Sequence, residues 1–436
     1  MIGEFIFYLK QSVGMPAEAK VKVGDRVRRG MLLAAKRGDK PGANLHASVN
    51  GTVLRTDEEK IIIEAEETDF SVYEKLKSDT PIELVEEAGI VGLGGAGFPT
   101  GEKLKADLSE NGFIIVNAAE CEPILSHNIQ RIEIEPHLLL RGLEIIMEMK
   151  RVKRGVIVIK GCHKKEIECL RQADAAGRFE IIELEDIYPI GEERAVIREV
   201  TGILLPPGTI PAKEDMLVLN AETVFRIREA VEERKPLIDK DLTVAGKLKE
   251  KPGLVKVLRD VPVGMKVSDV IDLAGGASEE YGEIIMGGPF TGERSRPDRG
   301  IRKTTGGLLV TETFLRGPEK IGILVCACGA DRNRLEQMAE SMGSQVAGVT
   351  YCKQAQERNG TYKCENPGRC PGQAGKVLEL KKQGAQALLI SNCTDCTNTV
   401  MACAPKMGLP VYHCTDGALR AVNQKLIRRM HKNENE

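Results

Sequence analysis

Tryptophan is absent from this chain, and aromatic residues make up only 4% of its 436 residues. So few rings offer no platform on which nucleic-acid bases could stack. The formal net charge is only −2, so the composition indicates no basic surface for nucleic acid or an anionic membrane. No uncharged apolar run approaches the about 18 residues of a membrane span. We therefore expect no nucleic-acid partner and no transmembrane segment.

The first residues, “MIGEFIFYLKQ”, lack the basic start and apolar stretch of a secretion signal. We expect a cytoplasmic protein that can associate peripherally with a membrane complex. In that compartment, twelve cysteines indicate metal or redox chemistry rather than a disulfide framework. Three of them precede residue 320, and nine lie between Cys326 and Cys414. This contrast predicts a separate cysteine-rich redox α/β domain over residues 320–436.

Residues 1–78 contain short strands and turns, such as “AKVKVGDRVRRGMLLAA” and the hairpin “SVNGTV”. This pattern resembles the barrel-sandwich hybrid fold of lipoyl and biotinyl domains. Carrier domains of that kind present a lysine at the hairpin tip, whereas here the tip is “SVNG”, residues 48–51. We expect a structural domain with no carrier lysine.

Residues 79–236 alternate between predicted strands and helices. Strands are expected at 113–120, 155–161 and 179–185, with helices at 136–151 and 164–174 between them. Such alternation predicts a Rossmann-like α/β domain with a covered parallel sheet. Residues 237–314 instead predict strands around one short helix that ends at a glycine pair, which resembles the β-grasp (SLBB) ligand-binding domain. The fold class we predict is therefore multidomain α/β.

The stretch “VGLGGAGFPTGEKLKADL”, residues 91–108, places Gly92, Gly94 and Gly97 in the G-x-G-x-x-G pattern. A dinucleotide turn needs a strand directly before the glycines, but “IELVEEAGIV” predicts a helix at least as well. A glycine loop that leads into a helix N-terminus also suits a phosphate group, with Lys103 adding positive charge. A dinucleotide turn, a phosphate cradle and a tight packing turn all remain open on these residues alone.

The motifs “GLGGAGFPTGEKL”, “VNAAECEP”, “EPHLLLRGLEI” and “LNAET” follow one another in this order. They resemble the NADH- and FMN-binding subunit of respiratory complex I, and more strongly the C subunit of Rnf ion-translocating ferredoxin:NAD oxidoreductases. The resemblance covers about residues 1–312. It implies FMN and NAD(H) as cofactors and hydride transfer from NADH to the flavin. One departure is Ala119, where the complex I subunit has an aspartate.

The resemblance also implies roles for individual residues. The glycines would line the phosphates, Lys103 would contact the flavin, and Phe98 would stack against the nicotinamide or its adenine. Polar residues at strand ends would hold the flavin, its phosphate and NADH. The residues that the resemblance assigns to cofactor binding are Gly92, Gly94, Gly95, Gly97, Phe98, Lys103, Asn117, Glu120, Glu122, Asn220 and Thr223.

Four apolar runs in the cysteine-rich part each end in cysteine: “IGILVCACG”, “QVAGVTYC”, “AQALLISNC” and “LPVYHC”. If they are parallel strands of one sheet, their cysteines gather at its carboxyl edge. Two more thiols lie in a Pro/Gly loop that can fold over the same edge. The candidate metal-binding set is Cys326, Cys328, Cys352, Cys364, Cys370 and Cys414.

“CTDC” lies between a predicted strand and a helix, so Cys393 and Cys396 are expected to face a helix N-terminus, which favours thiolate. Three interpretations of this region stay open. They are an iron–sulfur cluster such as 4Fe–4S, a dithiol relay through Cys393 and Cys396 as the catalytic pair, and a structural zinc site. The two ferredoxin-type repeats of an Rnf C subunit are missing.

The motifs “CENPGRCPGQ” and “SNCTDCTNTVMACAPKMGLPVYH” resemble the electron-transfer proteins associated with D-proline reductase in amino-acid-fermenting anaerobes. This resemblance implies that electrons pass from NADH through FMN and the cysteine centre to D-proline reductase, in Stickland fermentation. The alternative is an Rnf-like NADH:ferredoxin-type oxidoreductase subunit with another acceptor protein. A scaffold that has lost its cofactor is a third possibility, and a visible spectrum distinguishes it from the first two.

Overall fold

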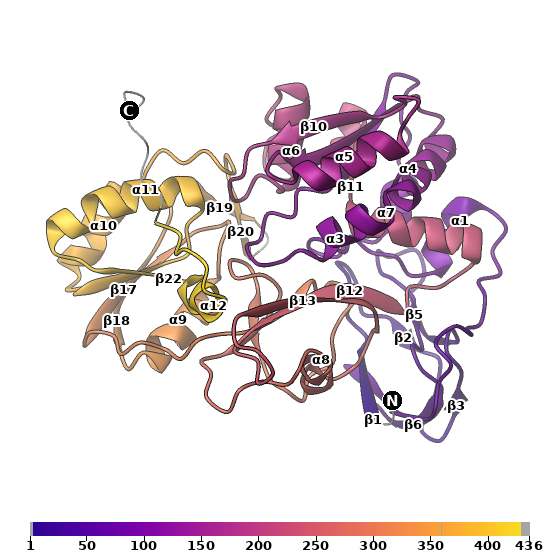
Figure 1. Ribbon diagram of the computed structural model, residues 1–436, viewed down its shortest axis with the longest axis horizontal. Coiled ribbons are helices and arrows are strands. Elements are labelled where there is room, and N and C mark those ends of the chain that lie inside the picture. The colour runs from indigo at the N-terminus through magenta and orange to yellow at the C-terminus, as the bar shows by residue number, and fades with distance from the viewer. Residues whose placement is uncertain (1–2, 359, 429–436) are drawn as a thin grey trace.

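The computed structural model describes residues 3–358 and 360–428. Four regions follow one another along the chain, and Figure 1 shows the last of them, orange to yellow, beside the magenta α/β region and the rose-coloured mixed sheet that contains β12 and β13. Within these residues, no helix has the length and apolar character that crossing a membrane requires.

The first region consists of short antiparallel strands in two sheets, ordered β1-β7-β6-β3 and β2-β4-β5. Ile61 and Ile63 of β7 are fully buried, and Ile62 between them is less buried, as expected for a strand with one face on a core. At the hairpin tip, the Ser48 hydroxyl donates to the Val263 carbonyl at 2.6 Å, so the tip is buried against the third region. The strands are β1 (Gly3–Tyr8), β2 (Glu18–Ala19), β3 (Arg26–Val27), β4 (Leu32–Ala35), β5 (Leu45–His46), β6 (Gly51–Thr56) and β7 (Lys60–Ala65).

The second region is a parallel sheet in the order β10-β9-β8-β11, as the sequence predicts. Helices cover both faces, so its strands are nearly continuous apolar runs. The elements are α1 (Pro81–Glu87), α2 (Thr100–Leu104), β8 (Phe113–Asn117), α3 (His127–Ile134), α4 (Pro136–Lys150), β9 (Arg154–Lys160), α5 (Lys164–Ala173), β10 (Glu180–Leu184), α6 (Glu193–Thr201), η1 (Pro211–Glu214), β11 (Met216–Asn220), α7 (Ala221–Arg228) and η2 (Glu229–Glu233).

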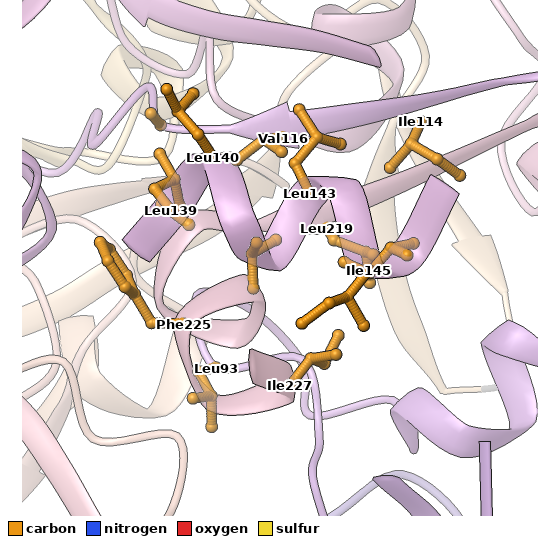
Figure 2. Packing of buried hydrophobic residues seen from close by; sticks show 14 of the residues in the cluster. Leu93, Ile114, Val116, Leu139, Leu140, Leu143, Ile145, Leu219, Phe225 and Ile227 are labelled. Carbon is orange, nitrogen blue, oxygen red and sulfur yellow. The ribbon is translucent and has the colours of Figure 1, made fainter. Parts of the chain in front are cut away.

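Alternate residues of each strand in this sheet face different helices. In β8, Ile114 and Val116 pack with α4 and α7, as Figure 2 shows, whereas Ile115 packs with α6. Gly142 of α4 lies so close to α7 that an added Cβ would be 2.6 Å from the Val224 carbonyl oxygen. The close approach of these two helices fixes the position of α7, whose N-terminus becomes important below.

The third region is a mixed sheet in the order β13-β12-β16-β14-β15 that packs with one helix, α8. Its apolar core is continuous with that of the first region, because Phe7 and Ile63 belong to the same buried cluster as Val244 and Ile271. The elements are β12 (Asp239–Gly246), β13 (Leu254–Pro262), α8 (Val267–Leu273), β14 (Ile284–Met286), β15 (Glu293–Ser295) and β16 (Gly307–Val310).

The fourth region is a parallel sheet in the order β18-β17-β21-β22, with a separate hairpin of β19 and β20. Figure 1 shows this hairpin on the side of the sheet that faces the second region. The elements are β17 (Lys320–Val325), α9 (Arg332–Ser341), β18 (Gln345–Tyr351), β19 (Ala355–Arg358), β20 (Thr361–Cys364), α10 (Ala374–Lys382), β21 (Ala387–Ile390), α11 (Thr394–Cys403), η3 (Pro405–Met407), β22 (Val411–His413) and α12 (Asp416–Ala421).

Buried charges connect the second region to the third. Asp241 of β12 accepts from Arg131 of α3 at 2.7 Å and from Arg226 of α7 at 3.0 Å. Beside them, Lys240 of β12 pairs with Glu222 of α7 at 2.5 Å. Burial raises the pKa of Asp241, but the two guanidinium groups more than offset it and hold that pKa below its ordinary value. The carboxylate is therefore ionised and binds two helices to one strand.

We predict that Asp241→Ala destabilises the chain by about 3–5 kcal/mol, because it removes the most deeply buried of the carboxylates that two buried guanidinium groups share. Urea unfolding at neutral pH measures the loss. A matched control is Asp298→Ala, since Asp298 pairs with Arg296 where both side chains are more than 60% exposed. The control is expected to cost less than about 1 kcal/mol. Equal losses in the two variants would contradict a structural role for the buried network.

Candidate functional site

The strand order of the second region reverses at β8. The chain passes from β8 to β9 and β10 on one side, whereas β11 lies on the other side of β8. Asn117 and Asn220 are the last residues of β8 and β11 and are paired in the parallel register. The carboxyl ends of strands at such a reversal are where open α/β sheets bind ligands. We refer to this place, with the loop of residues 92–98 beside it, as the crevice.

The glycine loop is closed by its own backbone and is attached to the first turn of α7. The Gly92 amide donates to the Phe98 carbonyl at 2.9 Å, which closes the loop on itself. The Leu93 amide donates to the Thr223 hydroxyl in the first turn of α7, at 3.1 Å. Phe98 is 43% exposed. The structure thus brings together the loop, Thr223 and an accessible aromatic ring.

Gly94 packs directly against Asn220, since an added Cβ would lie 2.3 Å from the Asn220 Nδ2. The Asn220 Oδ1 accepts from the Glu222 amide at 2.9 Å and caps α7. Around Gly95 there is nothing within 4 Å. The amides of Gly94 and Gly95 have no acceptor within residues 3–358 and 360–428. Open amides beside a helix N-terminus are the donors that a phosphate group needs.

A helix, rather than a strand, leads into the glycines. Thr80 and Glu83 form a capping box that begins α1, which ends at Glu87. The dinucleotide-turn interpretation is therefore wrong, because that turn requires a strand at this point. Gly97 has φ +72° and lies against Thr304 and the Gln11 carbonyl, so it makes a close turn against the first and third regions.

The helix after the loop, α2, is short. It runs only from Thr100 to Leu104, because the chain then turns toward Asp215, which accepts from the Ser109 amide at 2.6 Å. Lys103 is placed at the crevice all the same. Its Nζ donates to the carbonyl of Val218 in β11 at 2.9 Å and pairs with Glu193 of α6 at 2.8 Å. Glu193 is a crevice residue that the sequence analysis did not identify.

Glu120 and Glu122 follow β8, but both carboxylates have protein partners. Glu120 pairs with His127 at 2.9 Å and accepts from the Ile129 amide at 3.3 Å, at the start of α3. Burial opposes its ionisation, yet His127 holds the pKa of Glu120 below its ordinary value. The geometry does not support the expected role of Glu120 in holding cofactors.

Glu122 reaches into the third region instead. It accepts from the amides of Phe290 and Thr291 at 2.8 and 2.9 Å. Burial raises the pKa of Glu122, and the hydrogen bonds from Thr291 and Phe290 partly oppose that rise. Its carboxylate caps the turn 288–292, so its expected role as a cofactor-holding group is not supported either.

The cysteines of the fourth region gather at one edge of its sheet. Cys326, Cys352 and Cys414 come directly after the parallel strands β17, β18 and β22, and Cys393 comes three residues after the end of β21. This arrangement confirms the prediction that parallel strands bring these four thiols to the same edge. Cys364 differs from expectation, because it ends the hairpin strand β20 rather than lying in an irregular loop. We call this place the cysteine edge.

Three pairs of thiols at the cysteine edge lie close enough to interact: Cys326 with Cys352, Cys328 with Cys393, and Cys370 with Cys396. Cys364 lies near Cys352 and Cys393. Cys414 instead lies beside His413, with its Sγ 3.8 Å from the ring Nδ1.

Two cysteines outside “CTDC” favour the thiolate, whereas Cys396 within it does not. The pKa of Cys396 is raised, because its thiol donates to Cys370 and is buried. The pKa of Cys370 falls correspondingly to about 7, and the Gln373 side-chain amide also donates to its sulfur at 3.2 Å. The hydrogen bond from Cys326, with three backbone amides, lowers the pKa of Cys352 to about 6. Hydrogen bonds from neighbouring groups therefore outweigh the N-terminus of α11.

Within the part of the chain that the structure describes, no three His, Cys, Asp or Glu side chains are grouped so that they could hold a metal ion. A hollow of about 540 Å³ lies elsewhere, on the third region between Lys249, Asp272 and Tyr281.

Lys303 is bound to the segment that leads into the glycine loop. It is fully buried, and its Nζ donates to the carbonyls of Asn44 and Gly89, the latter at 2.8 Å. Gly89 lies three residues before the glycine loop, so Lys303 connects the first and third regions to the base of that loop. Desolvation lowers the pKa of Lys303 from 10.5 to about 7.

Two family models match the chain. One describes the Nuo51 FMN-binding domain and matches residues 85–229, and the other describes the RnfC barrel sandwich hybrid domain and matches residues 1–74. The crevice lies within the first match. The second match agrees with the resemblance that the sequence shows over its first region.

Among similar proteins is the C subunit of the proton-translocating ferredoxin:NAD+ oxidoreductase complex of Clostridium ljungdahlii, 31% identical over 69% of this chain and 69% of its own length. The C subunit of the Na+-translocating complex of Acetobacterium woodii is 31% identical, with 68% of this chain and 70% of the relative covered. The cobalamin reductase PduS of Salmonella typhimurium is 39% identical over 55% of this chain and 51% of its own length.

A solved structure, the NAD+-reducing nickel–iron hydrogenase in its H2-reduced state, aligns with a TM-score of 0.46 and 20% identity. The alignment covers 53% of this chain and 46% of the hydrogenase chain.

Lys303 gives a pH dependence of stability with a defined sign. Between pH 7 and 10.5 the unfolded chain holds the Lys303 proton and the folded chain does not. Folding then releases a proton, so this group makes the folded state more stable as pH rises. The free energy of unfolding of the wild type minus that of Lys303→Met should rise by about 1.4 kcal/mol per pH unit over this window. A difference that stays flat in urea titrations would show that Lys303 titrates normally.

Proposed function

This chain belongs to the RnfC-like family of electron-transfer subunits, and on that premise we propose that it oxidises NADH with FMN and passes the electrons on through its cysteine edge. The Rnf relatives are named for ferredoxin:NAD+ oxidoreduction, and the chain spans about two thirds of their length. Its activity, substrates and partners as a whole protein are parts of the proposal.

The observation that carries the proposal is the open amide pair of Gly94 and Gly95 beside the capped N-terminus of α7. It lies inside the match to an FMN-binding domain. These amides, with Gly92, Gly97, Asn220 and Thr223 around them, would hold the cofactor phosphates. When bound, FMN accepts a hydride from NADH and releases electrons singly.

Other residues of the crevice would position the cofactor and NADH. Lys103 would contact the flavin while Glu193 and the Val218 carbonyl hold its ammonium group in place. Phe98 is exposed enough to stack on the nicotinamide or the adenine. Asn117 would form part of the wall, and its own hydrogen bonds, to the Gly191 carbonyl and the Ala119 amide, keep that wall rigid. Glu120 and Glu122 would act on this geometry only through α3 and the turn 288–292.

Electrons would leave the crevice for the cysteine edge. The paired thiols there support a dithiol relay, with Cys393 and Cys396 in two different pairs. An iron–sulfur cluster held by cysteines of this edge has less support, because no three His, Cys, Asp or Glu side chains of the described residues are grouped to hold a metal ion.

Two acceptor proteins are candidates for the electrons that leave the cysteine edge. The family relatives are subunits of membrane complexes that act with ferredoxin, and they favour a ferredoxin-type acceptor and peripheral association with such a complex. D-proline reductase is the second candidate, supported only by the motifs around Cys364–Cys370 and Cys393–Cys414.

We predict that Gly94→Ala weakens FMN binding at least about tenfold, which corresponds to about 1.4 kcal/mol. An added methyl group at this position displaces Asn220, whereas Gly375→Ala, in α10 of the fourth region, adds the same group in open space away from the crevice and should leave FMN affinity close to that of the wild type. Titration of FMN fluorescence measures both affinities. Anaerobic addition of NADH should then bleach the flavin absorbance of the loaded wild type. A wild-type chain that does not bind FMN would refute the proposed function.

We predict that Cys396→Ser preserves NADH-driven flavin bleaching but slows onward electron transfer at least about tenfold, since serine keeps a hydroxyl donor but no redox-active sulfur. Onward transfer is assayed with ferredoxin and with D-proline reductase as separate acceptors. Cys403→Ser is the matched control on the same helix, because the Cys403 thiol donates to the Val400 carbonyl of that helix, at 3.6 Å. Equal loss of both steps in Cys396→Ser would count against the relay.

A further inference from the structure

Two buried rings meet face to face between the second, third and fourth regions. The ring centroids of Tyr188 and Phe290 are 3.7 Å apart, and their planes differ by 1°. Aromatic pairs generally prefer offset or edge-to-face arrangements with centroids about 4.5–7 Å apart. Tyr188 is 5% exposed and Phe290 is fully buried. The surroundings therefore hold these rings in nearly complete overlap and away from water.

Tyr188 is attached to the cysteine edge by three hydrogen bonds. Its backbone amide and its carbonyl both bond to the hydroxyl of Thr394, each at 3.2 Å. Its phenol hydroxyl donates to the Cys328 carbonyl. Thr394 directly follows Cys393, so Tyr188 is bound to the backbone of Cys328 and to the side chain that follows Cys393.

Phe290 is attached to the segment that follows β8. Its amide and that of Thr291 donate to Glu122, which is the neighbour of Cys121 in the chain. The Phe290 ring also meets the His413 ring, at 5.4 Å between centroids and with the planes at 85°. The ring therefore lies between the exit of β8 and the end of β22.

The segment 188–191 also reaches the crevice. The Asn117 Nδ2 donates to the Gly191 carbonyl at 2.8 Å, and Gly191 lies three residues after Tyr188. An added Cβ at Gly191 would be 3.1 Å from the Cys121 sulfur, so that sulfur packs against the segment. A continuous route of bonds and two hydrogen bonds thus runs from Asn117 through Gly191 and Tyr188 to Cys328.

We infer that Tyr188 and Phe290 form the electron-transfer junction between the crevice and the cysteine edge. The inference rests on the proposed function, since it requires flavin in the crevice. Electron tunnelling in proteins falls steeply with distance and proceeds best through covalent bonds, hydrogen bonds and tightly packed atoms. The stacked rings and the segment 188–191 supply all three in the part of the interface where the two sites approach each other.

The junction serves a two-electron step from the reduced flavin to a disulfide, and this step balances. Two electrons and two protons leave the reduced flavin, which becomes oxidised. A disulfide between two cysteines of the edge gains them, its S–S bond breaks and two thiols form. Tyr188 and Phe290 are chemically unchanged at the end, so they position and couple the two centres and are not catalytic residues.

The test uses the full chain loaded with FMN, after mild oxidation of the cysteine edge to disulfides. NADH is added without oxygen, flavin absorbance is followed by stopped flow, and new thiols are counted by rapid alkylation and mass spectrometry. In Tyr188→Leu and Phe290→Leu we expect flavin reduction at the wild-type rate but thiol appearance slowed at least about tenfold. Tyr188→Phe keeps the ring and should stay within about threefold of the wild type.

Two controls separate the junction from general packing. Tyr362→Leu disrupts another stacked pair, Tyr351 with Tyr362 at 4.1 Å, and should leave thiol appearance unchanged. A small dithiol reagent should reduce the oxidised edge equally fast in every variant, which shows without the flavin that the edge itself is intact. If a leucine variant loses its cooperative melting transition, Phe290→Met, of similar volume but without a ring, replaces it.

The possible outcomes bear separately on the junction and on the proposed function. Thiol appearance at the wild-type rate in Tyr188→Leu and Phe290→Leu overturns the junction, as does a wild type in which flavin is reduced but no thiol appears. If NADH fails to reduce the flavin, the proposed function fails, and flavin reduced by light then tests the junction by itself. A chain that binds no FMN overturns both.

Discussion

The buried ion pairs between α7 and β12 are the constraint on which the crevice depends. Arg226 and Glu222 of α7 are held by Asp241 and Lys240 of the third region, with almost no exposure of any of the four side chains. Because α7 begins at Asn220, its position decides where the helix N-terminus and the glycine loop meet. Charges this deeply buried tolerate few alternative arrangements, since each needs its partner at hydrogen-bonding distance. The geometry of the crevice is thus set by contacts with a different part of the chain.

The same logic places the cysteine edge relative to the crevice. Two parallel sheets, one in the second region and one in the fourth, each gather functional groups at their carboxyl ends. Glu122 and the turn 288–292 lie between them, and the Tyr188–Phe290 stack fills the space where they approach. A side chain expected to bind a cofactor thereby becomes part of the structure that joins two sites. This arrangement suits a protein whose proposed task is to move electrons between two centres.

Much of this architecture could be predicted from patterns along the chain. The alternating apolar runs predict the parallel sheet of β8, β9 and β10, and the four runs that end in cysteine predict the cysteine edge. These predictions succeed because the residues concerned either have partners nearby in the chain or recur with a regular period. The capping residues Thr80 and Glu83 also show locally why the segment before the glycines is a helix. One local pattern draws attention to Tyr188 and Phe290. The chain is poor in aromatic residues, yet “YPIG” and “GGPFTG” each place an aromatic residue in a Pro/Gly turn.

The sequence by itself determined the types and order of the elements and which chemical groups stand at the strand ends, because hydrophobic periodicity and turn residues act over a few neighbouring positions. Only the tertiary structure decided which groups those residues meet. Glu122 finds its partner 168 residues away at Phe290, and the Tyr188 amide finds its partner 206 residues away at Thr394. The pairing of the thiols, and with it the choice of Cys352 and Cys370 as the thiolate-favouring cysteines, has the same origin. Hydrogen bonds between distant segments form only after the sheets have packed, so no local pattern specifies them.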